Sequence, residues 1–255
     1  MNSKTHLRPP FKLVPQTTRS AAFIGLFCIS TAATSLAAFE ALPEATVEDP
    51  GISLGSGTSG ITGTVIDAHD SLFNVSTDFA GILRSMVVDT GLGFDFYYQI
   101  VNTGSDNGNG TDIFRLKTLG GFEGATLSVT YRTDLTGLDF AGFSNGPSGG
   151  AGAYAVGTKS VFSADRDEGS TGSVGFDFSP SHFLFDAANV QTGQSSQFAV
   201  IHTNLTTYAT TSADVSGLGT ARVASFALVP EPQTAAMVML GATVLSRRSR
   251  RHSRA

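Results

Sequence analysis

The sequence predicts an all-β fold, an antiparallel β-sandwich similar in layout to a jelly roll, with a signal peptide before it and a short apolar helix after it. Short runs of β-branched and aromatic residues are separated by turn-forming clusters, and several runs alternate apolar and polar residues. No stretch before residue 230 shows a long helical period. The composition agrees, because 29 glycines and 19 phenylalanines combine turn formers with large apolar side chains.

Eight short runs carry the predicted strands. They span residues 61–67, 82–89, 92–101, 113–119, 125–132, 173–178, 197–203 and 220–228. Clusters of Asn, Gly, Ser and Pro at 102–110 and 145–150 mark turns between them. The predicted sandwich domain is therefore residues 61–229.

Two of these runs indicate which side chains share a face. Successive side chains of a strand point to opposite faces, so alternate residues lie together. The pattern groups Phe94, Phe96, Tyr98 and Ile100 in one run, and Val174, Phe176 and Phe178 in another. It predicts one buried face and one face in contact with water for each of these strands.

The first 38 residues have the three parts of a secretory signal. A basic region broken by prolines precedes the apolar run 21–29, and small residues follow that run. Cleavage is predicted after Ala37 or Ala38, which also removes the single cysteine, Cys28. Residues 39–60 are predicted to be a flexible entry segment. Their GSGTSG stretch matches a dinucleotide-binding pattern, but no strand precedes it and no helix follows, so we interpret it as a linker.

The last 26 residues, 230–255, consist of three parts in a fixed order. Pro230, Glu231 and Pro232 end any preceding strand, because proline donates no backbone hydrogen bond. An uncharged apolar stretch follows at 234–246, and then come five arginines: Arg247, Arg248, Arg250, Arg251 and Arg254. By the positive-inside rule the arginines stay cytoplasmic, and the chain before Pro230 lies across the membrane. The 13 apolar residues would span about 20 Å of a hydrocarbon core about 30 Å thick, which argues against a permanent anchor.

This order of Pro230, Glu231 and Pro232, an apolar helix that contains Gly241, and an arginine cluster resembles the PEP-CTERM sorting signal. The resemblance implies export through a secretion translocon and transient insertion in the inner membrane. It also implies cutting near the Pro-Glu-Pro by an exosortase-type protease, and delivery to the cell surface or the extracellular polysaccharide matrix. The runs 94–102, 173–180 and 195–204 are similar to passenger domains of this family, whose activity is mostly unassigned.

The charge of residues 39–229, between the two predicted targeting segments, excludes some partners. Between residues 39 and 229 there are seven basic and twenty acidic residues, which gives a net charge of −13. A domain this acidic repels nucleic acid and anionic membrane surfaces, and it attracts cations.

Two acidic loops are candidates for calcium binding. Calcium takes six to eight oxygen ligands from carboxylates, amides and backbone carbonyls. The loops supply Asp106, Asn109 and Asp112 in one case, and Asp165, Asp167 and Glu168 in the other. Neither loop has the EF-hand spacing, and Asp, Asn and Gly are also ordinary residues of hairpin turns. Each loop is therefore interpreted either as a calcium site or as an ordinary hairpin turn.

No catalytic constellation stands out in the predicted domain. Residues 142–146 match the nucleophile-elbow pattern around Ser144, but Pro147 follows where that device needs a helix. The predicted mature chain has three dispersed histidines without metal-ligand spacing: His69, His182 and His202. We therefore predict that the protein is not an enzyme, and that it has no cofactor unless calcium binds.

The leading functional hypothesis is a structural or adhesive, noncatalytic protein of the cell surface or of a biofilm's extracellular matrix. The first alternative is a carbohydrate-binding module for the extracellular polysaccharide, in which three rings offer flat apolar faces to sugars: Tyr97, Tyr131 and Tyr154. The second alternative is an extracellular hydrolase that uses Ser144 or a pair of carboxylates.

Overall fold

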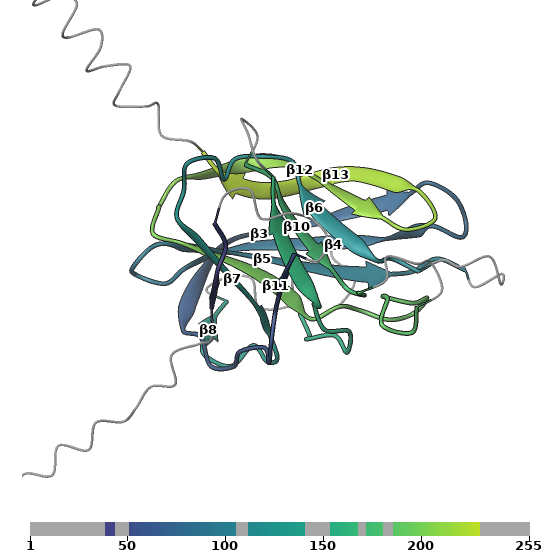
Figure 1. Cartoon of the computed structure of the whole chain (residues 1–255), viewed down its shortest axis with the longest axis horizontal. Coiled ribbons are helices and arrows are strands. Elements are labelled where there is room, and N and C mark those ends of the chain that lie inside the picture. Colours follow the sequence, from purple (N-terminus) through teal and green to yellow (C-terminus); the bar gives the residue numbers. More distant parts are fainter. Residues whose placement is uncertain are drawn as a thin grey trace, which may run out of the picture. The chain divides into compact units, whose positions relative to one another are not determined.

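The computed structural model describes residues 39–43, 51–105, 112–140, 154–167, 172–180 and 186–229. In these residues the chain forms thirteen strands and no helix (Figure 1), which confirms the all-β prediction. The predicted signal peptide and the predicted sorting tail lie outside them. Across the described ranges, no helix is long and apolar enough to cross a membrane.

Seven strands form the first sheet. Its order is β1-β7-β11-β5-β4-β3-β8, and all neighbours are antiparallel except β3 and β8, which are parallel. The strands are Glu40–Ala41 (β1), Leu127–Arg132 (β7), Phe198–Thr203 (β11), Phe94–Asn102 (β5), Ala80–Asp89 (β4), Gly63–Asn74 (β3) and Leu138–Asp139 (β8). A bulge between Val65 and Asp67 shifts the register of β3 against β4. As a result Val65 and Ala68 pack on the same face.

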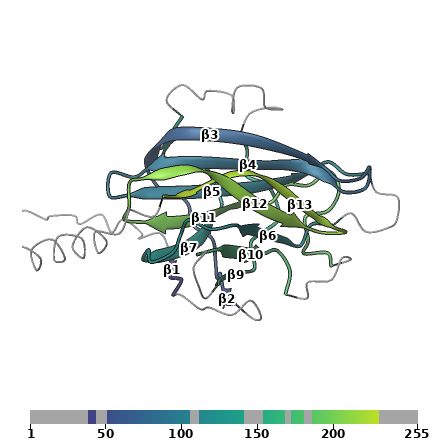
Figure 2. The same cartoon turned by 90° about the horizontal axis from the view of Figure 1, so that it is seen from above.

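Six strands form the second sheet, in the order β13-β12-β6-β10-β9-β2, and all of its neighbours are antiparallel. They are Thr220–Leu228 (β13), Tyr208–Ser216 (β12), Arg115–Thr118 (β6), Val174–Asp177 (β10), Ser163–Arg166 (β9) and Ile52–Ser53 (β2). Strand β13 packs against β3 and β4 of the first sheet, and Figure 2 shows the β12–β13 hairpin crossing these strands.

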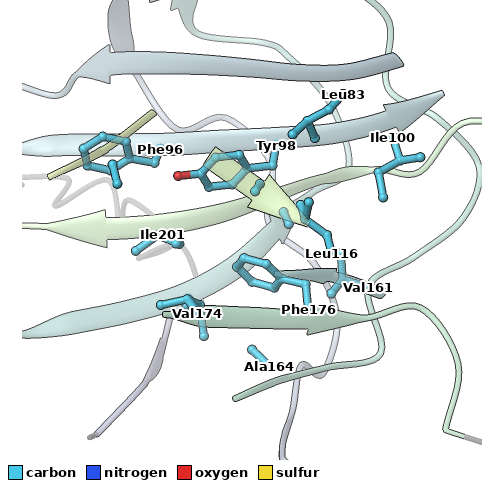
Figure 3. Close-up of a cluster of buried hydrophobic side chains, with 14 of the residues drawn as sticks. Leu83, Phe96, Tyr98, Ile100, Leu116, Val161, Ala164, Val174, Phe176 and Ile201 are labelled. Carbon is cyan, nitrogen blue, oxygen red and sulfur yellow. The ribbon is translucent and has the colours of Figure 1, made fainter. Parts of the chain in front are cut away.

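One apolar cluster lies between the two sheets (Figure 3). Phe96 and Tyr98 of β5 enter it from the first sheet, and Phe176 of β10 enters it from the second. The ring of Phe96 meets that of Phe122 edge-on, with the centroids 5.3 Å apart. The Tyr98 hydroxyl donates a 2.7 Å hydrogen bond to the carbonyl of Phe226, which links β5 to β13. The shared faces predicted for 94–100 and 174–178 are confirmed, because every member named above belongs to this cluster.

The opposite face of the first sheet is also buried, and the prediction that it would contact water is wrong. Asp95, Tyr97 and Gln99 of β5 are each at most 1% exposed. This face carries a second apolar cluster, which is covered by side chains of the segments 135–140 and 154–156. A period of two identifies residues that share a face, but it does not tell whether another segment covers that face.

All eight predicted strands are present, but the fold begins earlier than predicted. Strand β1 pairs with β7, β2 pairs with β9, and Leu42 and Leu54 belong to the core. The described part of segment 39–60 is therefore built into both sheets instead of being a flexible entry. Within its glycine-rich stretch, Gly57 touches Tyr131 so closely that a Cβ atom would lie 2.2 Å from the ring.

Candidate functional site

A pocket of about 480 Å³ opens beside the edge of the second sheet, where β2 pairs with β9. Small-molecule sites in proteins commonly have volumes of about 300–1,000 Å³, mostly apolar walls and a few polar groups. The walls of this pocket follow that composition, and its main side chains are Leu54, Tyr131, Lys159, Val161, Phe162 and Phe178.

The strand pairing fixes an exposed aromatic ring at this pocket. Val161 points into the core and is 1% exposed, so the next side chain, Phe162, points outward and is 40% exposed. The backbone of Phe162 is held on both sides. Its amide donates to the carbonyl of Asp177 at 2.7 Å, and its carbonyl accepts from the amide of Leu54 at 2.9 Å. The ring therefore projects from a well-anchored backbone.

Tyr131 forms a wall of the same pocket. It is 8% exposed, and its hydroxyl donates to the carbonyl of Gly55 at 3.1 Å. Tyr97 is completely buried, and Tyr154 stacks on Phe140 with the ring centroids 5.5 Å apart. The prediction that Tyr97 presents an open ring to sugars is wrong, because that ring is completely buried, and only a small part of Tyr131 is exposed at the pocket.

Lys159 brings a positive charge to the pocket. Its ammonium donates to the carbonyl of Ala187 at 2.5 Å. No ion pair joins it to a carboxylate among the residues that the structure describes. Because an ammonium has three N–H donors, Lys159 retains donors for a further acceptor.

A second candidate is an acid–base pair on the covered face of the first sheet. Strands β5 and β11 place Asp95 opposite His202, and Asp95 Oδ1 lies 2.5 Å from His202 Nδ1. The Asp95 side chain is fully buried, whereas that of His202 is 34% exposed. The Phe39 ring packs against the imidazole, with the centroids 5.0 Å apart. Asp95 Oδ2 is buried and accepts no hydrogen bond from the described residues.

The pair has a defined electrostatic character. Burial raises the pKa of Asp95, and the hydrogen bond with His202 offsets only part of that effect. The same hydrogen bond raises the pKa of His202, against the opposing effect of burial. Both shifts mean that the folded state binds protons more tightly than the unfolded state. The pair therefore stabilises the fold at low pH, and this contribution is lost as the pH rises through the folded pKa values.

We expect the advantage of the wild type over His202→Gln to be largest below pH 6.5 and to shrink as the pH rises through the folded pKa of His202. The substitution removes the imidazolium that pairs with the buried Asp95 carboxylate. Urea unfolding of both proteins across this pH range measures the difference. His69→Gln, which changes an exposed histidine of β3, is the matched control. A difference for His202→Gln that does not change with pH would contradict the expectation.

Ser128 extends the pair into a row. It lies opposite His202 on β7, so Asp95, His202 and Ser128 follow one another across three neighbouring strands. These are the residue types of a serine hydrolase. However, no hydrogen bond joins the Ser128 hydroxyl to the imidazole, although the structure describes both residues. The row therefore supplies an acid–base pair without an activated nucleophile.

A buried ion cluster lies on the face of the second sheet that points away from the core. Arg115 Nη1 donates to Asp177 Oδ1 at 2.6 Å, and Nη2 donates to the two oxygens of Asp165 at 2.7 and 2.9 Å. All three residues are at most 5% exposed. Gly175 makes room for them, because a Cβ atom there would lie 2.3 Å from Arg115 Nη2.

Two predicted calcium ligands take part in ion pairs. Arg115 binds Asp165, and Lys117 lies 2.7 Å from Asp167. A calcium ion at this loop would have to displace both cations. Asp112 is buried, and three candidates lie outside the described residues: Asp106, Asn109 and Glu168. Among described side chains, no group of three or more His, Cys, Asp or Glu is arranged to hold a metal ion. Calcium binding stays a prediction.

Sequence reasoning did not single out Lys159, Phe162, Asp95 or His202 as site residues. Alternation in the run 159–166 would have placed Phe162 on the face opposite Val161. Asp95 and His202 are 107 positions apart, so only the pairing of their strands brings them together. Ser144 and His182, which the sequence drew attention to, lie outside the described residues.

Comparison with known proteins adds no further constraint: no family model, no curated protein and no solved structure matches this chain.

Proposed function

We propose that this protein is an exported, noncatalytic component of the cell surface or of an extracellular matrix, sorted by an exosortase-type system. The observation that carries the proposal is the order of parts at the C-terminus: Pro230, Glu231 and Pro232, then the apolar stretch 234–246, then the arginine cluster. A basic end keeps that terminus cytoplasmic, so the folded domain is on the other side of the membrane. The basic and apolar start of the chain indicates the same direction.

The boundaries of the folded part support this proposal. Strand β1 begins at Glu40, directly after the predicted cleavage sites at Ala37 and Ala38. Strand β13 ends at Leu228, two positions before Pro230. The strands therefore fit between the two proposed processing sites, and neither cut would remove a residue of a sheet.

We also propose that the domain is a β-sandwich with a jelly-roll-like layout. The shared core and the packing of β13 on β3 and β4 support two layers that face one another. A domain of this kind suits a structural or adhesive role. Its expected partners are the secretion translocon, an exosortase-type protease and an extracellular polysaccharide, with transient insertion in the inner membrane.

The proposal is tested by following the protein in bacterial cells with and without an exosortase. Mass spectrometry of the protein from cells with the enzyme should give an N-terminus at residue 38 or 39 and a C-terminus near residue 230. Cells without the enzyme should keep the tail, with the protein held in the inner membrane. Replacing the five arginines of residues 247–254 by glutamine should reduce membrane retention, because the orienting charge is lost. Recovery of intact residues 1–255 from the cytoplasm of both strains would refute the proposal.

A further inference from the structure

We propose that the pocket beside β2 and β9 binds an acidic sugar, that is, a pyranose ring with a carboxylate, within a polysaccharide. The source of the ligand rests on the proposed function, which places the domain in a polysaccharide matrix. The site itself rests on Phe162 and Lys159, two side chains that the core and the ion clusters leave available.

Phe162 supplies the apolar platform that a sugar ring needs. The C–H groups of a pyranose pack against flat apolar surfaces, and an aromatic ring offers such a surface at little cost in side-chain entropy. Phe162 is 40% exposed although it follows a core residue on a paired backbone. Burial of such a ring under a ligand removes apolar surface from water in both partners. Leu54 and Phe178 also line the apolar part of the pocket.

Lys159 indicates that the ligand carries a negative charge. Residues 39–229 include twenty acidic and seven basic residues, so most of the basic side chains have a carboxylate nearby. Examples are Arg115, Lys117 and Arg222. Lys159 lines the pocket with only the Ala187 carbonyl as its acceptor among the described residues. A carboxylate on the ligand would complete its coordination with a charge-assisted hydrogen bond.

The backbone around Lys159 is ordered in a way that favours binding. The Lys159 amide donates to the carbonyl of Ser195 at 3.2 Å, and its carbonyl accepts from Gln197 at 2.7 Å. These hydrogen bonds hold the Lys159 backbone against residues 195–197, the segment that leads into β11. Because this backbone is already fixed, less backbone conformational entropy is lost when the ammonium binds a ligand. Ser53 and Ser160 also line the pocket, and a serine hydroxyl can exchange hydrogen bonds with sugar hydroxyls. Aromatic platform, cation and hydroxyls together match an acidic sugar better than a neutral or a purely apolar molecule.

The test is calorimetric titration of the secreted, processed protein with oligogalacturonate and with a neutral galacto-oligosaccharide of the same length. We expect the acidic ligand to bind at least tenfold more tightly than the neutral one. Phe162→Ala should weaken binding of oligogalacturonate by about tenfold or more, since stacking on an aromatic ring is lost. Lys159→Gln should reduce the preference for the acidic ligand and weaken its dependence on salt.

Matched controls are Lys117→Gln, which removes a cation outside the pocket, and Leu92→Ala, which removes an exposed apolar side chain elsewhere. Both should leave binding unchanged, and thermal unfolding should show that all four variants are folded. Equal affinity for the two sugars, absence of binding, or equal losses in Lys159→Gln and Lys117→Gln would overturn the proposal. If the protein is exported and processed but binds no acidic sugar, only this site fails. If it binds the sugar but stays in the cytoplasm, the proposed function fails.

Discussion

Arg115→Met should lower the free energy of unfolding by about 3–5 kcal/mol, because it removes the guanidinium that pairs with two buried carboxylates. Asp165 and Asp177 are at most 1% exposed and share the one guanidinium of Arg115. Loss of one member of a buried ion cluster leaves uncompensated charge in a poorly solvated place, and water cannot replace the partner there. Urea unfolding of the wild type and the variant at neutral pH measures the loss.

Two further variants make this expectation specific. Arg222→Met removes an ion pair with Asp214 in which the arginine side chain is 67% exposed, so unfolding should hardly change. A triple variant in which Arg115, Asp165 and Asp177 all become apolar residues of similar volume should recover most of the lost stability, since the three charges of this cluster are removed together. If Arg115→Met unfolds at the same urea concentration as the wild type, the ion cluster is not a determinant of stability.

Phe176→Ala should cost about 3–5 kcal/mol, the range for removal of a fully buried phenylalanine. Phe176 is 0% exposed and reaches from β10 into the space between the sheets, among Tyr98, Leu116 and Val174 (Figure 3). The cost has two parts: the transfer free energy of the ring, and a cavity that neighbouring strands cannot close without breaking their pairing. Denaturant unfolding monitored by circular dichroism gives the value.

Phe162→Ala is the control for this second prediction. It makes the same chemical change only 14 positions away, but the Phe162 ring is 40% exposed and lies outside the core cluster. Its loss of stability should be much smaller than that of Phe176→Ala. Comparable losses in the two variants would show that the core between the sheets is not where the sequence and the structure locate it.

The strands that the sequence predicted are those with large apolar residues in alternation. Phe94, Phe96 and Phe176 gave clear signals, and all three enter the shared core. Strand β12 escaped prediction because its residues 208–216 are mostly small and polar, and it is held by pairing with β13 and β6. Strands β1 and β2 have two residues each, too few for any period. Their positions are decided by tertiary pairing, which local sequence does not encode.

The candidate sites were harder to predict than the strands, for a related reason. Tyr97 and Tyr131 were chosen as aromatic rings, but ring chemistry does not reveal that segments 135–140 and 55–57 cover them. Phe162 is exposed because no described segment covers its ring completely. Which segments cover a ring depends on how the whole chain folds. The Asp95–His202 pair depends on the register of β5 against β11, and a shift by one residue would have separated the two side chains.

Strand β1 limits where the proposed N-terminal cleavage can fall without disturbing the first sheet. Glu40 and Ala41 pair with Val129 and Ser128, and the Phe39 ring covers His202. A chain that starts at residue 38 or 39 keeps all of these contacts, whereas trimming by an aminopeptidase to residue 42 would uncover the edge of β7 and remove the ring that packs against the imidazole. Residues 39–41 are thus a structural part of the first sheet, and a change at this position would disturb the pairing with β7 and the packing of Phe39 on His202.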